Sequence, residues 1–465
     1  MAFGAVMGVK QVKVDVNSLS VGMFVSGLDR PWTQTPFPLQ GFYIRDAEDI
    51  VQLQQYCKFV TVDVEKQPLP VVTSLKVMSR VPPARQGKPL ASTEKTQKAG
   101  PLGPIVTVPP VKVVHNHYPV QEPLKKEVKK AEQLHQEVFS SVTDVVQQLD
   151  AGEAVSLKST RRAASAMVDS ILRHPDALTW LARVKDVDEH TYSHSVRSAV
   201  WAIIFGRHIG MAKEDLDLLA MGVLLKDIGK SHLDRELLEK HERTPAEEKQ
   251  YQQFVTLGVE MLRSDPAIEP RVISVVKNHC ERLNGTGFPV GLKGGKIPVS
   301  ARIAGMVSFY DEITHSRGGS RPLSPSRAVS RLYECRNREF QEDLVVEFIR
   351  AIGLYPTGTL VELSTGEVAI VVEQNTERRL KPKVLIVLDA CKKPLQKPLM
   401  FDLAKDERDK QALVDSGKAD YTTVGLIEIA TDLEQGSFDI DVAEFREKYL
   451  FKNERNFLKG LFGRS

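Results

Sequence analysis

The sequence has few cysteines and no long apolar run, and both absences exclude classes of protein. Among the 465 residues there are four cysteines, and no two of them form a Cys-x-x-Cys pair. A disulfide framework or a zinc knuckle is therefore not expected, and sparse cysteines suit a reducing compartment. No window approaches 18 consecutive apolar residues, and the N-terminus lacks the basic and apolar regions of a signal peptide. We expect a cytoplasmic protein that is neither secreted nor membrane-spanning.

An excess of charge of one sign is also absent. The chain carries 63 Lys and Arg against 60 Asp and Glu, a net charge of +3, which gives no reason to expect specific nucleic-acid binding. With 42% hydrophobic residues, a chain of this length has enough material for about two to four domains.

The first 65 residues predict a small β-rich module. Valines alternate with polar residues over 12–16, and strand-like runs cover 22–25 and 59–62. A short helix with an aspartate cap is expected over 46–56. Together these elements predict a small α+β domain.

Residues 66–125 predict a linker. They hold 11 of the 26 prolines and nine Lys and Arg against two Glu. Because prolines remove backbone donors and block helices, we expect an extended and largely disordered segment. Its positive charge indicates a solvated face or a contact with an anionic partner.

Residues 126–355 predict a helical domain. Apolar residues recur at three- and four-residue steps over 128–149, and this stripe can pack on the following domain or on a second copy. Strand patterns return over 356–440, with a hairpin signal at Ser364-Thr365-Gly366. The tail, 441–465, is basic and amphipathic, so it can lie on a membrane surface, on a partner or on its own protein.

Four stretches of the helical region carry chemical information. They are His190-Thr191-Tyr192-Ser193-His194, Lys226-Asp227-Ile228-Gly229-Lys230, the stretch from Asn278-His279-Cys280-Glu281 to Gly287-Phe288-Pro289, and the stretch from Ala301-Arg302-Ile303 to Tyr310-Asp311.

Taken together, these stretches resemble the HD-GYP family of cyclic-di-GMP phosphodiesterases, a branch of the HD metal-dependent phosphohydrolases, over about residues 180–355. The N-terminal module and the stretch after Gly353 are similar to those of one HD-GYP subgroup. The resemblance implies a mainly α fold, in which an HD-type helical bundle follows a small α+β N-terminal domain and a Pro-rich linker and precedes a β-rich C-terminal extension.

In this family the bundle holds two or three iron or manganese ions, which imidazole and carboxylate ligands suit. The ions polarise the phosphodiester and turn a bridging water into a nucleophile. Three of the family's eight ligand positions are kept in this chain, as His194, Asp227 and His279.

Five ligand positions are altered. Lys226 replaces the histidine of the HD pair, Phe254 replaces a later histidine and Ser308 replaces an aspartate. His190 and Cys280 also stand at changed positions, although each could still bind iron or zinc. Cys280 could equally be an ordinary buried cysteine.

Lys226 is the most consequential change, because it places an ammonium group where a metal ion should lie. A unit charge and a divalent ion about 4 Å apart repel by roughly 8 kcal/mol at an effective dielectric near 20. The sequence therefore leaves room for at most one iron or manganese ion at reduced occupancy, and no di-iron or tri-iron site is expected. We expect the Lys226 ammonium to replace the missing cation and neutralise Asp227.

The resemblance also implies contacts to the nucleotide. Asp227 and Lys230 match the positions that carry catalysis, and Lys230 matches the lysine that meets the phosphate. Arg317 matches an arginine that meets the nucleotide in active members. Gly287-Phe288-Pro289 matches the signature tripeptide that shapes the pocket, but without its tyrosine hydroxyl.

Three functions remain open at this point. The first is a regulator with lost hydrolytic chemistry that senses cyclic-di-GMP or docks a diguanylate cyclase (GGDEF) domain. The second is an active phosphodiesterase with a variant ligand set that includes His190 and Cys280. The third is a structural protein whose basic linker and tail organise a membrane-proximal complex. Cyclic-di-GMP signalling implies a bacterial cytosol, with biofilm formation, motility or virulence as outputs.

Overall fold

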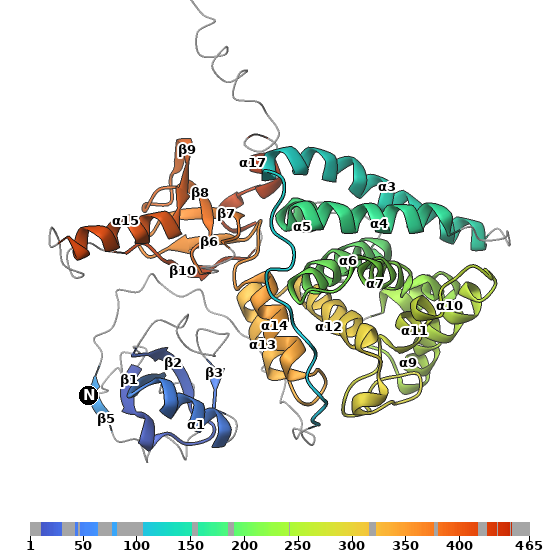
Figure 1. The fold of residues 1–465 in the computed structure, drawn as a ribbon, viewed down its shortest axis with the longest axis horizontal. Helices are drawn as coiled ribbons and strands as arrows, with labels where there is room; N and C mark the ends of the chain where they lie inside the picture. The colour runs from blue at the N-terminus through green and yellow to red at the C-terminus, as the bar shows by residue number, and fades with distance from the viewer. Residues whose placement is uncertain are drawn as a thin grey trace, which may run out of the picture. The chain divides into compact units, whose positions relative to one another are not determined.

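The computed structural model describes residues 11–29, 42–44, 47–63, 77–80, 106–150, 157–184, 190–240, 242–315, 322–375, 380–416, 426–434, 436–446 and 448. The chain divides into two compact units, Met1–Leu102 and Gly103–Ser465, and each is described by itself (Figure 1).

The first unit contains an antiparallel sheet with the strand order β3-β2-β4-β1-β5. Its elements are β1 (Gln11–Asp15), η1 (Val16–Ser18), β2 (Phe24–Leu28), β3 (Phe42–Tyr43), α1 (Ala47–Tyr56), β4 (Phe59–Asp63) and β5 (Val77–Arg80). Val12 pairs with Val62 and Val14 with Val60, and all four are buried. This alternation confirms the predicted β-rich module. Strand β5 lies in the stretch that the prolines had assigned to the linker.

The second unit is mainly helical, as the sequence predicts. Its helices up to the C-terminal sheet are α3 (Leu124–Asp150), α4 (Lys158–Arg173), α5 (Pro175–Val184), α6 (His190–His208), α7 (Lys213–Leu225), η4 (Ile228–His232), α8 (Arg235–Glu239), α9 (Pro245–Gln252), α10 (Phe254–Leu262), α11 (Pro270–Asn278), η5 (Gly294–Lys296), α12 (Val299–Thr314), α13 (Pro325–Glu334) and α14 (Glu342–Ile352).

The apolar stripe of α3 packs on α4 and α5 of the same chain (Figure 1). Val128, Ala131 and Val138 are fully buried in this contact. An apolar stripe that repeats every 3.6 residues needs an apolar surface to pack against. Of the two partners expected for this stripe, the following helical domain of the same chain is the one that it contacts.

Glu127 is a buried charge that ties α3 to α4. Its carboxylate accepts hydrogen bonds from Ser170 Oγ at 2.8 Å and from Arg173 Nε and Nη2 at 2.9 and 2.7 Å. Burial by itself raises the pKa of Glu127, but the bonds from Arg173 and Ser170 outweigh it and hold the pKa below its usual value.

Residues 106–123, which we call the strap, are extended, as their prolines predict, but they are bound to the second unit rather than free. The expected disorder therefore does not hold for this part of the linker. Three backbone N–H groups of the strap donate to carbonyls of the helical region: Val106 to Asn337, Val114 to Ile209 and Gln121 to Arg173.

A second antiparallel sheet, with the order β10-β6-β7-β8-β9, follows the helices. The strands are β6 (Leu360–Leu363), β7 (Val368–Glu373), β8 (Lys383–Leu388), β9 (Pro394–Asp402) and β10 (Ile429–Asp432). The same part of the chain contains the helices α15 (Leu403–Asp415), η6 (Ser437–Asp439) and α17 (Val442–Arg446). The predicted β6–β7 hairpin is present, whereas the sequence patterns missed β9, α15 and β10.

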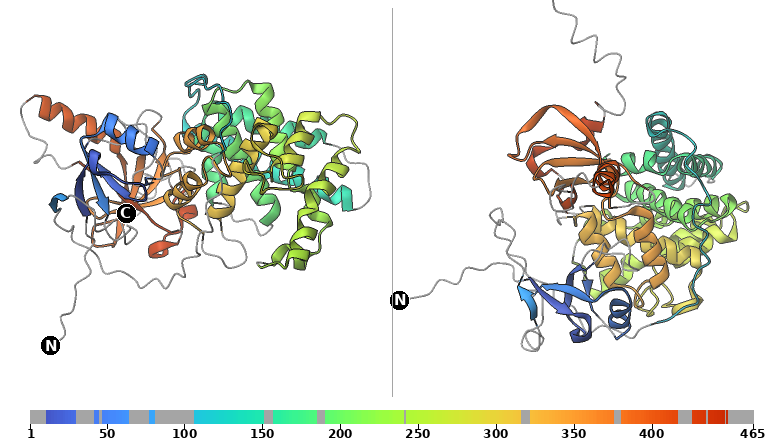
Figure 2. Two further views of the ribbon diagram at one scale, coloured as in Figure 1. Left: turned by 90° about the horizontal axis from the view of Figure 1, so that it is seen from below. Right: turned by 60° about the vertical axis from the view of Figure 1, so that its left-hand side comes forward.

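This sheet is fastened to the helical bundle, beside which it lies in both views of Figure 2. Trp180 Nε1 of α5 donates to Val372 O of β7 at 2.8 Å. Thr357 Oγ1 donates to the buried Asp176 carboxylate at 2.9 Å. Among the described helices, none has the length and apolarity needed to span a membrane. Of the tail predicted over 441–465, residue 447 and residues 449–465 lie outside the described residues.

Replacement of Glu127 by Ala is expected to lower the free energy of unfolding by about 2 kcal/mol. This is less than the cost of breaking a fully buried pair, because the Arg173 side chain is 31% exposed. Since the folded-state pKa of Glu127 is lowered, its contribution is present above the unfolded-state value near 4.5 and is lost as the pH falls below it. Denaturant unfolding at pH 7 and pH 4 measures both effects.

The exposed Glu137 of α3 provides the matched control. Glu137→Ala is expected to change the free energy of unfolding by less than about 0.5 kcal/mol. Equal effects of the two substitutions would contradict the role assigned to Glu127.

Candidate functional site

Four elements bring the family-matched residues together. His194 lies on α6, Lys226 and Asp227 follow α7, Lys230 lies on η4 and His279 caps α11.

The turn that carries Asp227 and Lys230 is pressed closely against α10. A Cβ atom on Gly229 would lie 2.1 Å from Phe254 O and 2.5 Å from Gly258 N, so any side chain at Gly229 would force η4 away. The close approach places Lys230 Nζ 4.8 Å from the centre of the Phe254 ring, a distance at which a cation interacts favourably with an aromatic face.

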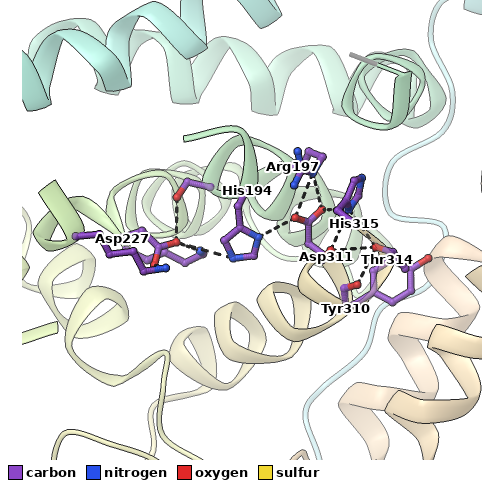
Figure 3. A network of polar contacts seen from close by, with 10 residues as sticks. His194, Arg197, Asp227, Tyr310, Asp311, Thr314 and His315 are labelled. Carbon is purple, nitrogen blue, oxygen red and sulfur yellow. Dashed lines mark hydrogen bonds and ion pairs between the residues drawn. The ribbon is translucent and has the colours of Figure 1, made fainter. Parts of the chain in front are cut away.

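His194 is oriented by a carboxylate on α12. Its Nδ1 lies 2.7 Å from Asp311 Oδ2, and Asp311 is also bonded by Arg197 Nε at 3.0 Å and lies 3.2 Å from His315 Nδ1 (Figure 3). Burial by itself raises the pKa of Asp311, but Arg197 and His315 outweigh it and hold the pKa far below its usual range. Because an ionised carboxylate only accepts, Nδ1 of His194 carries the proton, and Nε2 faces Asp227 at 3.9 Å.

Both oxygens of Asp227 contact an ammonium group. Lys226 Nζ bonds to Oδ2, and Lys230 Nζ lies 2.6 Å from Oδ1. Ser195 Oγ donates to Oδ2 at 3.2 Å. Burial by itself raises the pKa of Asp227, but the charges of Lys226 and Lys230 outweigh it and keep the carboxyl well below its usual value.

Lys226 is one of the largest fully buried side chains, with 1% of its surface exposed. Burial lowers its pKa, while the Asp227 carboxylate acts in the opposite direction. An isolated ammonium at this depth would lose its proton, but a contact with a carboxylate stabilises the charged form. The ion pair is therefore the reason that both side chains can be buried.

The residues that would face the metal ions do not fit a pair of divalent cations. Two ammonium groups occupy both oxygens of Asp227, and a divalent ion about 4 Å from either one would be repelled by roughly 8 kcal/mol at an effective dielectric near 20. The donor atoms of His194, Asp227 and His279, all described, do not form a set within 4.8 Å of one another.

His279 is a buried, neutral imidazole packed against an aromatic ring. Its Nδ1 lies 2.8 Å from Val276 O, and the Phe254 ring lies 5.9 Å from its own ring. Burial lowers the pKa of His279 to about 3, so the imidazole is neutral at pH 7.

The altered ligand positions offer few donors. Burial raises the pKa of the Cys280 thiol to about 12, so a thiolate is costly there. Ser308 Oγ is buried without a hydrogen-bond partner among the described residues. The backbone of His190 begins α6, but its side chain lies outside the described residues, as does all of Arg317. The ligand roles of these residues remain predictions.

The Gly287-Phe288-Pro289 tripeptide belongs to a loop that is built around Glu281. The buried Glu281 carboxylate accepts from the backbone N–H groups of Val290, Gly291 and Leu292 at 2.9, 3.1 and 2.8 Å. Phe288 lies 6.0 Å from the Phe254 ring, where it closes the apolar side of the cluster. The outer side of the loop is exposed, with Val290 63% accessible.

The sequence motifs include Asp311 as a kept aspartate of the resemblance but give no role to Arg197, His315 or the Glu281 carboxylate. Arg197 follows His194 by three residues and His315 follows Asp311 by four, spacings that place each pair on one helix face. These spacings could have indicated that Arg197 lies beside His194 and His315 beside Asp311. The contact between α6 and α12 that joins the two pairs appears only in the structure.

Comparison with protein families matches three segments of the chain. A model described as "HD domain" matches residues 182–344. A model described as "Domain of unknown function (DUF3391)" matches residues 11–160, and one described as "KOW domain associated with HD domain" matches residues 360–408.

Among curated proteins, the chain is 28% identical over 385 residues to the cyclic di-GMP phosphodiesterase PA4108 of Pseudomonas aeruginosa, covering 82% of this chain and 86% of that protein. It is 26% identical over 215 residues to the cyclic di-GMP phosphodiesterase response regulator RpfG of Xanthomonas campestris, covering 45% of this chain and 57% of RpfG. It therefore spans most of PA4108 but little more than half of RpfG. A solved structure, Bd1817, a HDG"Y"P protein from Bdellovibrio bacteriovorus, matches 73% of this chain and 98% of its own at 14% identity and a TM-score of 0.42.

Replacement of Asp227 by Asn is expected to lower the free energy of unfolding by about 3–5 kcal/mol, because two buried ammonium groups lose their counter-charge. Lys226→Met is expected to cost about 1 kcal/mol or less, since Asp227 keeps Lys230 and the methionine fills a similar volume. The double variant should lose less than the sum of the two, with a coupling of about 1–3 kcal/mol. Denaturant unfolding of metal-free protein measures all four states.

The exposed pair Arg235–Glu239, with side chains 89% and 64% accessible, is the control for this cycle. Arg235→Met and Glu239→Gln should couple by less than about 0.5 kcal/mol. A coupling between Lys226 and Asp227 as small as that of the control would show that the buried pair does not hold the site together.

Proposed function

The chain is an HD-domain protein homologous to cyclic-di-GMP phosphodiesterases, and from this premise we propose that it is a cyclic-di-GMP signalling protein that does not hydrolyse the nucleotide. The observation that carries the proposal is the contact of both Asp227 oxygens with the ammonium groups of Lys226 and Lys230. To bind a metal ion, the Asp227 carboxylate would need a free lone pair on at least one oxygen, and both oxygens are engaged by ammonium groups.

The arrangement also argues against a residual water-activating site. A metal-activated hydroxide requires a cation that lowers the pKa of bound water, and an ammonium group has no coordination position to offer. Lys226 can replace the charge of a metal ion but not its chemistry. The protein therefore keeps the fold of the family but does not carry out the hydrolytic step.

Docking of a partner is the form of regulation that the contacts favour. Lys230 is 9% exposed at its side chain and bonded to Asp227, so it would have to leave that carboxylate before it could meet a phosphate. The Gly287-Phe288-Pro289 loop, by contrast, is held by Glu281 and presents the exposed apolar side chain of Val290, and Val299 at the start of α12 is exposed as well. We propose a diguanylate cyclase (GGDEF) domain as the partner of this loop.

Nucleotide sensing by Lys230, Arg317 and the loop is the second form of the same function. The alternative function is an active phosphodiesterase with one iron or manganese ion held by His194, Asp227 and His279 together with His190 and Cys280. We place the protein in the bacterial cytosol, and a peripheral membrane contact of the tail belongs to the same proposal.

Cyclic-di-GMP turnover by anaerobically purified protein supplied with Fe(II) or Mn(II) tests the proposal. PA4108 serves as the positive control, since it is a cyclic di-GMP phosphodiesterase. We expect no turnover above background and no difference between the parent and a His194→Ala/Asp227→Ala variant. Turnover by the folded parent would overturn the proposal, and its loss in a single His194→Ala variant, which keeps the contacts of Asp227 with Lys226 and Lys230, would establish the alternative.

A further inference from the structure

A group of metal-ligand side chains lies away from the residues considered so far. Among the described residues, His115, His208 and Glu347 place one donor atom each within 4.8 Å of the others. They come from three elements, since His115 lies in the strap, His208 ends α6 and Glu347 lies on α14. None of the three belongs to the motifs of the helical region that resemble HD-GYP proteins.

Both imidazoles direct Nε2 at the same carboxylate oxygen. His208 Nε2 lies 2.8 Å from Glu347 Oε2, and His115 Nε2 lies 3.8 Å from it. The first distance is a hydrogen bond, but the second is too long for one. His208 is held by a hydrogen bond, whereas His115 meets the group through a ring contact with His208, with the ring centres 5.1 Å apart, and at ion-pair distance from Glu347.

A small divalent cation could use a donor atom of all three. Zinc binds imidazole nitrogen at about 2.0–2.1 Å and carboxylate oxygen at about 2.0–2.2 Å, so ligand atoms around a tetrahedral ion lie roughly 3.3 Å apart. The two observed separations, 2.8 and 3.8 Å, fall on either side of that value. Shifts of about half an ångström would bring both nitrogens to that separation from Glu347 Oε2, and all three donor atoms already lie within 4.8 Å of one another. Water would take the fourth position.

The backbone already holds His115 in place. Val114 N donates to Ile209 O at 2.9 Å on one side, and Arg207 Nη2 donates to Tyr118 O at 2.6 Å on the other. Gly210, in a positive-φ conformation (φ 78°), lets the strap come near: a Cβ atom there would lie 2.5 Å from Val114 O. The strap therefore presents His115 beside the end of α6 without an ion.

The second oxygen of Glu347 is also oriented. Arg350 Nη1 donates to Oε1 at 2.6 Å, which leaves Oε2 for the histidines, and a hydrogen bond of this kind is typical of carboxylate ligands. The charge of Arg350 opposes a cation, but its side chain is 43% exposed and solvent screens the repulsion.

We propose that His115, His208 and Glu347 form a binding site for a zinc-class divalent cation that fastens the strap to α6 and α14. The site joins the segment that follows the N-terminal unit to the HD domain. It is independent of the HD residues and of whether the protein hydrolyses cyclic-di-GMP.

The test is a titration of untagged, metal-stripped full-length protein with Zn²⁺ in competition with a chromophoric chelator. We expect one bound ion per chain, and we expect His115→Ala to weaken binding by more than about tenfold, because loss of even a partner of a ligand costs that much. His115 is 51% exposed, so its replacement leaves the fold intact. His117→Ala, an exposed histidine two residues along the strap, is the matched control and should bind like the parent.

His194→Ala distinguishes this site from the HD residues. Binding that survives His194→Ala and falls with His115→Ala supports the proposal. Absence of a bound ion in the parent, equal binding by His115→Ala and His117→Ala, or loss of the ion with His194→Ala would each overturn it.

Discussion

The Asp227 carboxylate between the ammonium groups of Lys226 and Lys230 is the interaction on which the centre of the helical bundle depends. Three charges are buried there together, and the two ammonium groups are tolerable only because the carboxylate is present. One negative carboxylate lies between two positive ammonium groups, so the cluster has a net positive charge. A carboxylate that held a divalent metal ion would also give a cluster of positive charge. The same packing of η4 against α10 that brings Lys230 to Asp227 also brings it over Phe254. Phe254 therefore contacts this cluster through Lys230.

The neighbouring network has kept the form of a ligand environment. Asp311 fixes the tautomer of His194 and turns Nε2 toward Asp227, as the outer carboxylate of a metal-bound histidine does. Glu281 likewise holds the Gly287-Phe288-Pro289 loop through three backbone N–H groups. Both devices stabilise the fold by hydrogen bonds alone. These parts of the scaffold are therefore held in place without a contribution from a metal ion.

Much of this fold could be predicted because local patterns determine it. The alternating valines of β1 and the apolar stripe of α3 each report one buried face, and the motif spacings identified the HD region. The strap could not be predicted, because its prolines exclude a helix but say nothing about the carbonyls of Asn337, Ile209 and Arg173 that accept its bonds. The grouping of His115, His208 and Glu347, far apart in sequence, was unpredictable for the same reason. The sequence did predict that Lys226 would neutralise Asp227, because the resemblance places Lys226 where a metal ion would otherwise be bound, and the contact is present.

Metal content of a Lys226→His variant tests the central claim most directly. The measurement is iron or manganese per chain after anaerobic reconstitution, made in a His115→Ala background so that the strap site does not contribute, with the exposed Lys240→His as control. If the Lys226 ammonium occupies the place of a cation, the parent and the Lys240→His protein hold little metal, and Lys226→His holds substantially more, which a further His194→Ala removes. Stoichiometric metal in the parent, or equally low metal in all variants, would contradict the account.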